Sequence, residues 1–415
     1  MNASAADSAR YAVRPLLPGP ADALRGAVLA LGAGPAALPM LARHGSQEAF
    51  ALRGLAPDET RVLEREFRHL GGEVLSSLNG DRVVLLGPLS AFGSLPARLV
   101  EWGRRTEALG AALQEALAGK GGAVRPVDAR GVRLVFGVRT LVMGVVNVTP
   151  DSFSGDGLAE LGVEAAVEQA VAMAAAGADV IDIGGESTRP HSVEVSEAEE
   201  LGRVLPVLRG ALERLPASVA VSIDTRKAAV ARAAVEAGAH LVNDVWGLRG
   251  DPEMARVVAA SPGVAVVCMH NQRGTDYLGD VVEEVAAGLR ESMVVAERAG
   301  IESERVIVDP GIGFGKTPAQ NVEVLRRLGE LRGLARPVLV GASRKSTVGL
   351  LLGGAPPEER LEGSLALAVL AAERGADIVR VHDVAQTVRA LRAADAVIHG
   401  VPAELRDVPA PGPTG

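Results

Sequence analysis

The chain has 415 residues, of which 48% are hydrophobic and 23% charged, and this composition is typical of a soluble globular protein with a large core. Its net charge of −8 argues against a general nucleic-acid binder, and no apolar run is long enough to cross a bilayer. The single cysteine, Cys268, excludes an internal disulfide framework, so we expect a cytoplasmic protein. The first residues do not have the pattern of a signal peptide, so we expect none.

The N-terminal part of the chain is predicted to form a small domain of its own. We expect a disordered N-terminus at 1–10, a small α/β accessory domain at 11–118 and a linker at 119–130, where Gly and Pro interrupt the pattern. The predicted elements of the domain are a helix, a strand and a second helix, at 57–72, 81–88 and 95–117. Nothing in its sequence assigns the domain a function.

From residue 131 to about 400, short apolar runs alternate with segments of helical composition. The predicted strands are 141–147, 179–184, 219–224, 240–245, 264–269, 305–309, 337–342 and 377–381. Eight strands and eight helices in about 260 residues favour a (β/α)₈ TIM barrel, although alternation alone does not exclude an open doubly wound sheet. We expect this catalytic domain to span 131–400, with a hairpin near 132–136 that closes the bottom of the barrel and a disordered tail at 401–415.

Polar and charged side chains follow all eight predicted strands. In a barrel the carboxyl ends of the strands lie on one face, so these side chains are expected to form one polar pocket. For Asp244 and Ser222 we favour a plainer interpretation as helix caps. The expected pocket residues are Asn147, Thr188, Arg189, Asp224, Asn243, His270, Asp309, Ser343, Lys345, Arg380 and His382.

The side chains of this pocket indicate the kind of ligand. The carboxylates and amide of Asp224, Asn243 and Asp309 suit a flat heterocycle with N–H donors along one edge, as they suit a guanidinium group. An anionic group would be met by cationic donors, namely Arg189, Lys345, Arg380 and His382. No His/Cys zinc spacing and no Ser-His-Asp or Cys-His constellation stands out.

Seven motifs occur in the order known from one enzyme family. The sequences "MGVVNVTPDSFSGDG", "GADVIDIGGESTRP", "VSIDTRK", "LVNDV", "DPGIGFGKT", "GASRKS" and "IVRVHDV" together resemble the dihydropteroate synthases, the pterin-binding enzymes of folate biosynthesis that sulfonamides target. The resemblance runs from about 139 to 398, whereas "GIGFGK" alone would be a weak match to a phosphate loop.

The resemblance implies an activity. Enzymes of this family join 6-hydroxymethyl-7,8-dihydropterin diphosphate to p-aminobenzoate, giving 7,8-dihydropteroate and pyrophosphate in a Mg²⁺-dependent displacement with SN1 character. It implies that the catalytic residues are Asp224, Lys345 and Arg380. It also implies that the pterin is bound by Asp224, Asn243, Asp309, Lys345, Phe314 and Gly313, and the diphosphate by Asn147, Thr188, Arg380 and His382, with Asn147 as the Mg²⁺ ligand.

The resemblance further implies that the loops after the first two strands form a lid and the p-aminobenzoate pocket. The residues concerned are Thr149, Pro150, Asp151, Ser152, Phe153, Thr188, Arg189, Pro190 and Ser343. We expect small-molecule substrates, no nucleic-acid or membrane partner, and a homodimer. The chain departs from the family pattern in "SFSGDG", at His191 and at Arg226, but none of these departures removes a group with an implied role.

Two other functions remain open from the sequence. A corrinoid-linked methyltetrahydrofolate methyltransferase would share the pterin-binding groups but has no need of the "TPDSFS" loop or of "SRK". A non-catalytic pterin-binding paralogue would have lost lid or diphosphate residues, and none is lost here.

Overall fold

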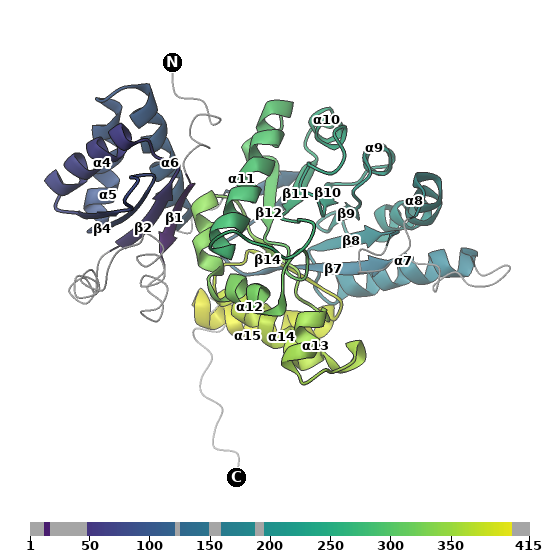
Figure 1. Ribbon diagram of the computed structural model, residues 1–415. Coiled ribbons are helices and arrows are strands. Elements are labelled where there is room, and N and C mark those ends of the chain that lie inside the picture. Colours follow the sequence, from purple (N-terminus) through teal and green to yellow (C-terminus); the bar gives the residue numbers. More distant parts are fainter. Residues whose placement is uncertain (1–11, 17–47, 121–124, 149–158, 187–194, 401–415) are drawn as a thin grey trace, which may run out of the picture.

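A computed structural model of the chain describes residues 12–16, 48–120, 125–148, 159–186 and 195–400. These residues form a barrel with a small α/β domain at its side (Figure 1). The ends predicted to be disordered, 1–10 and 401–415, lie outside the described residues.

The larger unit is a barrel of parallel strands. In the described part of the chain, eight strands pair in the order β12-β11-β10-β9-β8-β7-β14-β13, and a parallel bridge between Val308 and Val338 joins the two ends of the row. The strands are β7 (Leu141–Asn147), β8 (Val180–Gly184), β9 (Ala220–Asp224), β10 (Leu241–Asp244), β11 (Ala265–Met269), β12 (Val306–Asp309), β13 (Leu339–Val340) and β14 (Ile378–Val381). The predicted TIM barrel is confirmed, and the open sheet is excluded because the row closes on itself.

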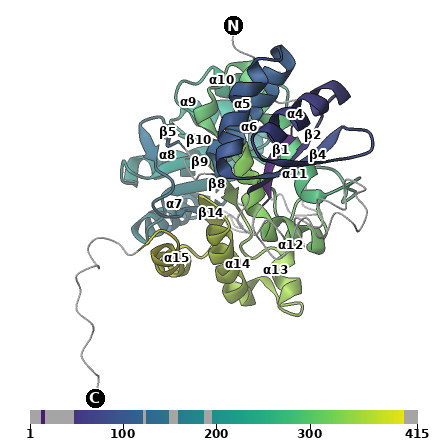
Figure 2. The ribbon, with the colours of Figure 1, turned by 90° about the vertical axis from the view of Figure 1, so that its left-hand side faces the viewer.

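Helices surround these strands (Figures 1 and 2). Polar side chains begin several of them: Ser196 caps α8, Asp280 caps α11, and Thr317 forms a capping box with Gln320 on α12. The helices are α7 (Ala159–Ala175), α8 (Glu197–Arg214), α9 (Ala228–Glu236), α10 (Met254–Ala259), α11 (Val281–Ala299), α12 (Pro318–Arg326), α13 (Ser346–Leu351), α14 (Leu361–Glu373) and α15 (Val384–Ile398), with 3-10 turns η3 (Ser303–Arg305), η4 (Leu328–Leu334) and η5 (Pro357–Glu359). No described helix is long and apolar enough to cross a bilayer.

A hairpin closes the amino-terminal end of the barrel. Strands β5 (Val127–Ala129) and β6 (Val132–Leu134) pair antiparallel across a turn in which Arg130 and Gly131 have positive φ angles. Its apolar side chains and Phe136 are buried in one cluster with residues of all eight barrel strands, among them Leu141. The hairpin expected near 132–136 is therefore present, and its first strand lies within the segment expected to be a linker.

The N-terminal domain is an antiparallel sheet covered by helices. In the described residues the strand order is β1-β2-β4-β3, with β1 (Ala12–Leu16), β2 (Glu48–Arg53), β3 (Glu73–Ser76) and β4 (Arg82–Gly87). The helices are α4 (Pro57–His69), α5 (Leu89–Val100) and α6 (Arg104–Lys120). The single helix predicted at 95–117 is wrong, because Gly103, with a φ of 110°, turns the chain between α5 and α6.

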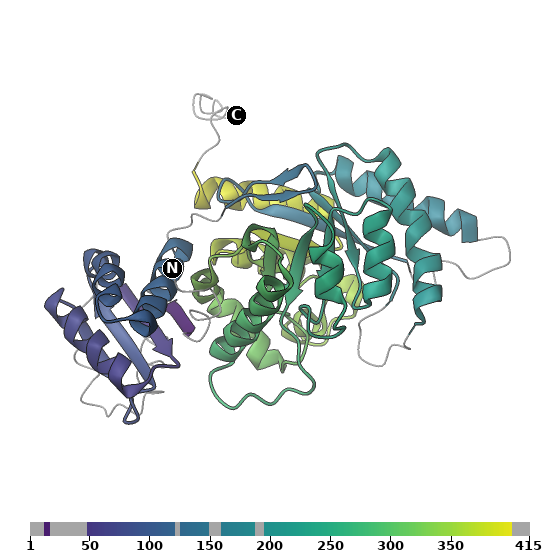
Figure 3. The ribbon, with the colours of Figure 1, turned by 90° about the horizontal axis from the view of Figure 1, so that it is seen from above.

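This domain contacts the outer helices of the barrel. Helix α6 lies so close to η4 that a Cβ atom on Gly119 would be 1.7 Å from the carbonyl oxygen of Arg332. An ion pair joins Arg336 to Glu115 at 3.1 Å, and Arg290 on α11 donates to the carbonyl of Val13 at 2.7 Å. Figure 3 shows the same arrangement from above, with the domain beside the barrel. It therefore packs on the side of the barrel through specific contacts.

Candidate functional site

Charged side chains from neighbouring strands meet at the carboxyl end of the barrel. Arg380 of β14 donates from Nε to Asp182 Oδ2 at 2.7 Å and from Nη2 to Asp224 Oδ2 at 2.6 Å. Asn243 of β10 donates to the same Asp182 oxygen at 2.9 Å. The structure thus brings together three predicted site residues, Asp224, Asn243 and Arg380, around a carboxylate that was not predicted.

Asp182 is the central residue that sequence reasoning missed. It lies inside β8 and is fully buried. Its Oδ1 atom has no hydrogen-bond partner within the described residues, although buried carboxylate oxygens are normally paired. The available signal was the sequence "VIDIG", in which a single carboxylate interrupts an otherwise apolar strand. A buried acceptor without a partner indicates a place for an N–H group of a ligand.

Burial changes the protonation equilibria of this cluster. It raises the pKa of Asp224 to about 7, against the guanidinium of Arg380 and with the help of the neighbouring Asp182. Burial lowers the pKa of Lys345 to about 8, while Asp309 opposes the shift. It also raises the pKa of Asp309, which Lys345 opposes. Acids and bases whose pKa values approach neutrality are common in active sites.

The segment "PGIGFGK" forms a tight turn beside Asp309. Gly311, Gly313 and Gly315 all have left-handed backbone angles, which only glycine adopts without strain. Lys345 donates to the carbonyl of Ile312 at 2.6 Å, and its ammonium lies 4.5 Å from the centre of the Phe314 ring. The predicted site residues Gly313, Phe314, Asp309 and Lys345 therefore lie together.

Ser343 and His382 meet on the β13 and β14 side of the same face. The Oγ atom of Ser343 lies 3.2 Å from Nδ1 of His382 and accepts the backbone N–H of His382 at 3.3 Å. Ser343 is buried, whereas Asn147, at the end of β7, is exposed. Two residues expected to bind the diphosphate, Asn147 and His382, are therefore among those that the structure describes.

The helix-cap interpretation of Asp244 and Ser222 is wrong for both residues, because the helix after β10, α10, begins at Met254 with Glu253 as its N-cap residue. Asp244 accepts the backbone N–H groups of Trp246 and Leu248, at 2.9 and 2.7 Å, and so caps the turn that follows β10. Ser222 is not a helix cap, because it lies buried inside β9. Its Oγ atom has no hydrogen-bond partner within the described residues.

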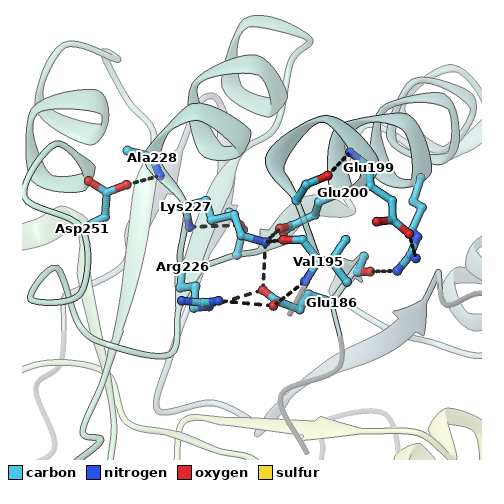
Figure 4. A network of polar contacts seen from close by, with 12 residues as sticks. Glu186, Val195, Glu199, Glu200, Arg226, Lys227, Ala228 and Asp251 are labelled. Atoms are coloured by element: carbon cyan, nitrogen blue, oxygen red, sulfur yellow. Dashed lines mark hydrogen bonds and ion pairs between the residues drawn. The ribbon is translucent and has the colours of Figure 1, made fainter. Parts of the chain in front are cut away.

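Apart from Ser343, the residues predicted for the lid and the p-aminobenzoate pocket lie outside the described residues, within 149–158 and 187–194. They are Thr149, Pro150, Asp151, Ser152, Phe153, Thr188, Arg189 and Pro190. The two residues that flank the second segment, Glu186 and Val195, are described and are joined directly (Figure 4). Glu186 accepts the backbone N–H of Val195 at 3.3 Å. Lys227 donates to both residues, at 3.0 Å to the carboxylate of Glu186 and at 2.6 Å to the carbonyl of Val195.

Two further side chains complete this network. Glu200 is fully buried and accepts from Lys227 at 2.5 Å, and Arg226 donates to the carboxylate of Glu186 at 3.3 Å. Arg226 is one of the departures from the family pattern, and the structure gives it a partner at the base of this segment. The network fixes the separation of the residues on either side of 187–194.

The described residues offer a metal few protein ligands. No group of three or more His, Cys, Asp and Glu side chains in the described part of the chain could hold a metal ion. The amide oxygen of the exposed Asn147 is a ligand of the type that Mg²⁺ prefers. This arrangement suits a cation bound mainly through phosphate oxygens of a substrate.

Known proteins share both the motifs and the fold. A family model described as "Pterin binding enzyme" matches residues 143–382. The chain is 46% identical over 263 residues to a dihydropteroate synthase of Clostridium beijerinckii, covering 63% of this chain and 96% of that protein. A solved structure of the Xanthomonas albilineans dihydropteroate synthase with 4-aminobenzoic acid matches with a TM-score of 0.62 and 47% identity, covering 66% of this chain and 97% of the other.

The similarity to one further relative extends beyond the barrel of this chain. The chain is 43% identical over 357 residues to a Haloferax volcanii protein named as a probable bifunctional folylpolyglutamate synthase/dihydropteroate synthase, covering 81% of this chain and 42% of that protein. An alignment of this length exceeds the barrel and must include part of the region before it. Part of the N-terminal region is therefore similar to a segment of this archaeal protein.

Proposed function

The chain belongs to the pterin-binding enzyme family, among its dihydropteroate synthases, and we propose that it joins 6-hydroxymethyl-7,8-dihydropterin diphosphate to p-aminobenzoate at the carboxyl end of the barrel. The observation that carries this proposal is the buried cluster in which Arg380 links two carboxylates while one oxygen of Asp182 has no partner among the described residues. A buried cluster of acceptors and a few cations suits a neutral heterocycle that carries an anionic group.

The pterin ring would bind along the carboxylates and amide of the cluster. Asp309 and Asn243 offer acceptors to the N–H edge of the ring, and Asp182 Oδ1 is an acceptor still without a partner in the described residues. Lys345, whose ammonium lies over the ring of Phe314, would act as a donor to the heterocycle. This distribution of donors and acceptors would orient the heterocycle with its methylene carbon near Asp224.

The diphosphate would lie toward Asn147, Arg380 and His382. Mg²⁺, held by Asn147 and the substrate oxygens, would neutralise the charge of the departing pyrophosphate. The guanidinium of Arg380 and a ring nitrogen of His382 would donate to the same oxygens. Arg380 is held in place by two carboxylates, so little reorganisation is needed when charge develops on the leaving group.

Loss of pyrophosphate leaves positive charge on the pterin methylene, in the SN1-like manner of the family. The ionised carboxylate of Asp224 would stabilise this charge, and the amine of p-aminobenzoate then forms the new C–N bond. The attacking amine must lose a proton afterwards. Since burial raises the pKa of Asp224 to about 7, this carboxylate can hold that proton near neutral pH.

We propose that p-aminobenzoate binds after the pterin diphosphate. Its pocket would be formed by Phe153, Thr188, Arg189 and Pro190 together with Ser343. The solved relative with 4-aminobenzoic acid supports a site for this substrate class in the family. Tight binding of p-aminobenzoate to the free enzyme would contradict this order.

We further propose a cytoplasmic homodimer. Exposed leucines gather on two neighbouring helices, with Leu350 and Leu351 on α13 and Leu370 on α14. Several exposed apolar side chains on adjacent elements are typical of a protein interface. The one cysteine, Cys268, is a free buried thiol, as suits a reducing compartment.

The decisive experiment is product formation by the full chain. We expect 7,8-dihydropteroate and pyrophosphate to appear in equal amounts from the two substrates with Mg²⁺, and neither to appear with a chelator in its place. Methyl transfer from methyltetrahydrofolate to a corrinoid protein would favour the methyltransferase alternative. Pterin binding without either reaction would favour a non-catalytic paralogue.

A further inference from the structure

Lys316 is a buried lysine that has no role in the reaction proposed above. It ends the segment "PGIGFGK", and only 7% of its surface is exposed. Its ammonium donates to the carbonyl oxygens of Gly311 and Phe314, both at 3.1 Å. The third contact is Nδ1 of His270, at 3.2 Å. A charged ammonium has three N–H donors, and all three have an acceptor here.

His270 is suited to be an acceptor in this group. Burial, together with the nearby charges of Lys316 and Arg249, lowers the pKa of its ring to about 3, so the ring is neutral near pH 7. The contact with Lys316 then requires the tautomer whose proton lies on Nε2. Burial also lowers the pKa of Lys316 to about 7, while the carboxylate of Asp309 opposes this and favours the charged form.

Within the turn at 311–315, the N–H of Phe314 donates to the carbonyl of Gly311 at 3.1 Å, and side chains from outside the turn supply further contacts. Its three glycines have left-handed backbone angles, and glycine gives the unfolded turn the largest conformational freedom. Three successive contacts fix its carbonyl groups: Lys316 holds those of Gly311 and Phe314, and Lys345 holds that of Ile312. The turn is therefore held between two lysines, one of which faces the candidate pterin site.

We propose that Lys316 is a positioning residue for pterin binding, which holds the turn so that Lys345 and Phe314 face the ring. The inference rests on the proposed function, because it concerns the affinity of the pterin site. Without the ammonium, the carbonyls of Gly311 and Phe314 lose a charged partner inside the protein. The turn is then free to move the carbonyl of Ile312, and with it the ammonium of Lys345.

The chain offers a matched control at the other end of β12. Arg305, just before this strand, is also a buried cation that donates to three backbone carbonyls, those of Val264, Val258 and Ser261, at 2.7 to 2.8 Å. It lies at the amino-terminal end of the barrel, where the hairpin closes it. Lys316→Met and Arg305→Met thus remove the same kind of interaction from opposite ends.

The experiment compares the two variants in the full chain. The measurements are the calorimetric Kd for 6-hydroxymethyl-7,8-dihydropterin, the KM for p-aminobenzoate at saturating pterin diphosphate, and the Tm. For Lys316→Met we expect a Kd for the pterin that is roughly 10- to 100-fold weaker, as when buried acceptors lose a charged partner, and an unchanged KM for p-aminobenzoate. For Arg305→Met we expect a lower Tm and an unchanged Kd.

Two results would overturn the inference. One is a folded Lys316→Met protein with the Kd of the wild type. The other is a weakening of pterin binding in both variants that follows their loss of Tm, because this would make Lys316 a general structural residue. Should Lys316→Met not fold, Lys316→Gln, whose amide can still donate to one carbonyl, takes its place with the same expectations.

The wild type separates this inference from the proposed function. If the wild type binds no pterin and forms no dihydropteroate, the proposed function is wrong. If it does both and Lys316→Met binds equally well, only the role of Lys316 is wrong.

Discussion

The two ends of the barrel contain similar charged residues in opposite arrangements. At the amino-terminal end, two buried charged side chains are held by backbone groups: Arg305 donates to three carbonyls, and Asp377 accepts the N–H of Val338 at 2.8 Å while it pairs with Arg332. At the carboxyl end, Lys316 is also held by backbone carbonyls, but the charged side chains of the central cluster pair with one another. Arg380 joins Asp182 and Asp224, and Asp182 keeps an oxygen without a partner in the described residues.

This difference separates stability from function. A buried charge whose hydrogen bonds are complete has nothing left to offer a ligand, so it stabilises the fold. A buried cluster of side chains with an unpaired atom and shifted pKa values is costly, and such sites persist where a ligand completes them. The predictions below test this separation, first at the two ends of the barrel and then at its side.

The largest effect is expected at the amino-terminal end, for Phe136→Ala. This ring is buried in the cluster of the hairpin and the strands. Its loss should lower the free energy of unfolding by about 3–5 kcal/mol, the range for a large aromatic side chain in a core. Denaturant unfolding gives this quantity, and kcat/KM should stay that of the wild type at temperatures where the variant is folded. A large loss of kcat/KM in the folded variant would break the separation.

At the carboxyl end, Asp309→Ala and Lys345→Ala should each abolish detectable pterin binding. Loss of one charged partner in a pocket costs about 2–5 kcal/mol, or roughly 30- to 4000-fold in affinity. Calorimetry with the pterin measures the loss, and thermal unfolding serves as the control. Wild-type affinity in either variant would remove that residue from the site.

A change of pH tests the residue that the sequence did not reveal. Burial raises the pKa of Asp224 to about 7, and the neighbouring charge of Asp182 contributes to this increase. If ionised Asp224 is required, kcat/KM should rise as the pH increases through about 7. In Asp182→Asn this rise should occur at lower pH, because a neighbouring negative charge has been removed. An unshifted pH–rate profile would show that Asp182 does not act on Asp224.

The smallest effect is expected from removal of the N-terminal domain. The fragment 126–415 keeps the whole hairpin but loses the contacts of Glu115 and Val13 with the barrel. We expect a lower Tm, because these contacts are lost, and a kcat/KM within about threefold of the full chain, because surface ion pairs contribute little and the barrel residues in these contacts, Arg290 and Arg336, are not candidate site residues. A cooperatively folded fragment that turns over roughly a hundredfold slower, far beyond what the loss of these contacts explains, would make the domain part of the active site.

The sequence predicted the barrel well because each of its units is a local pattern. A strand such as β9 is a short apolar run, and helix α9 begins soon after it at Ala228, so neither depends on distant residues. The N-terminal domain was harder to predict. Its strands β1, β2 and β3 were missed, because β1 and β2 pair across a long segment and short strands carry a weak signal. The break at Gly103 was lost within a long helical pattern.

The site was predicted where it depends on strand ends, and missed where it depends on long-range contacts. Asp224, Asn243 and Arg380 were found from their positions at the ends of strands. Asp182 was missed because its partner Arg380 lies 198 residues further along the chain. Lys316 was hidden in the same way, since its contact with His270 joins two different strand ends.

The join between β12 and β13 has a consequence for the motion of the barrel. Strand β13 has two residues, and β12 reaches it through one bridge and the hydrogen bond from the N–H of Val308 to Pro337, whereas four residue pairs join β12 to β11. Local opening should therefore begin at this join. Asp309 follows β12 and Lys345 follows β13, so a ligand bound to both spans the join and opposes its opening. The Val308 amide hydrogen should then exchange with solvent more slowly when the ligand is bound, although this amide lies within a strand of the barrel.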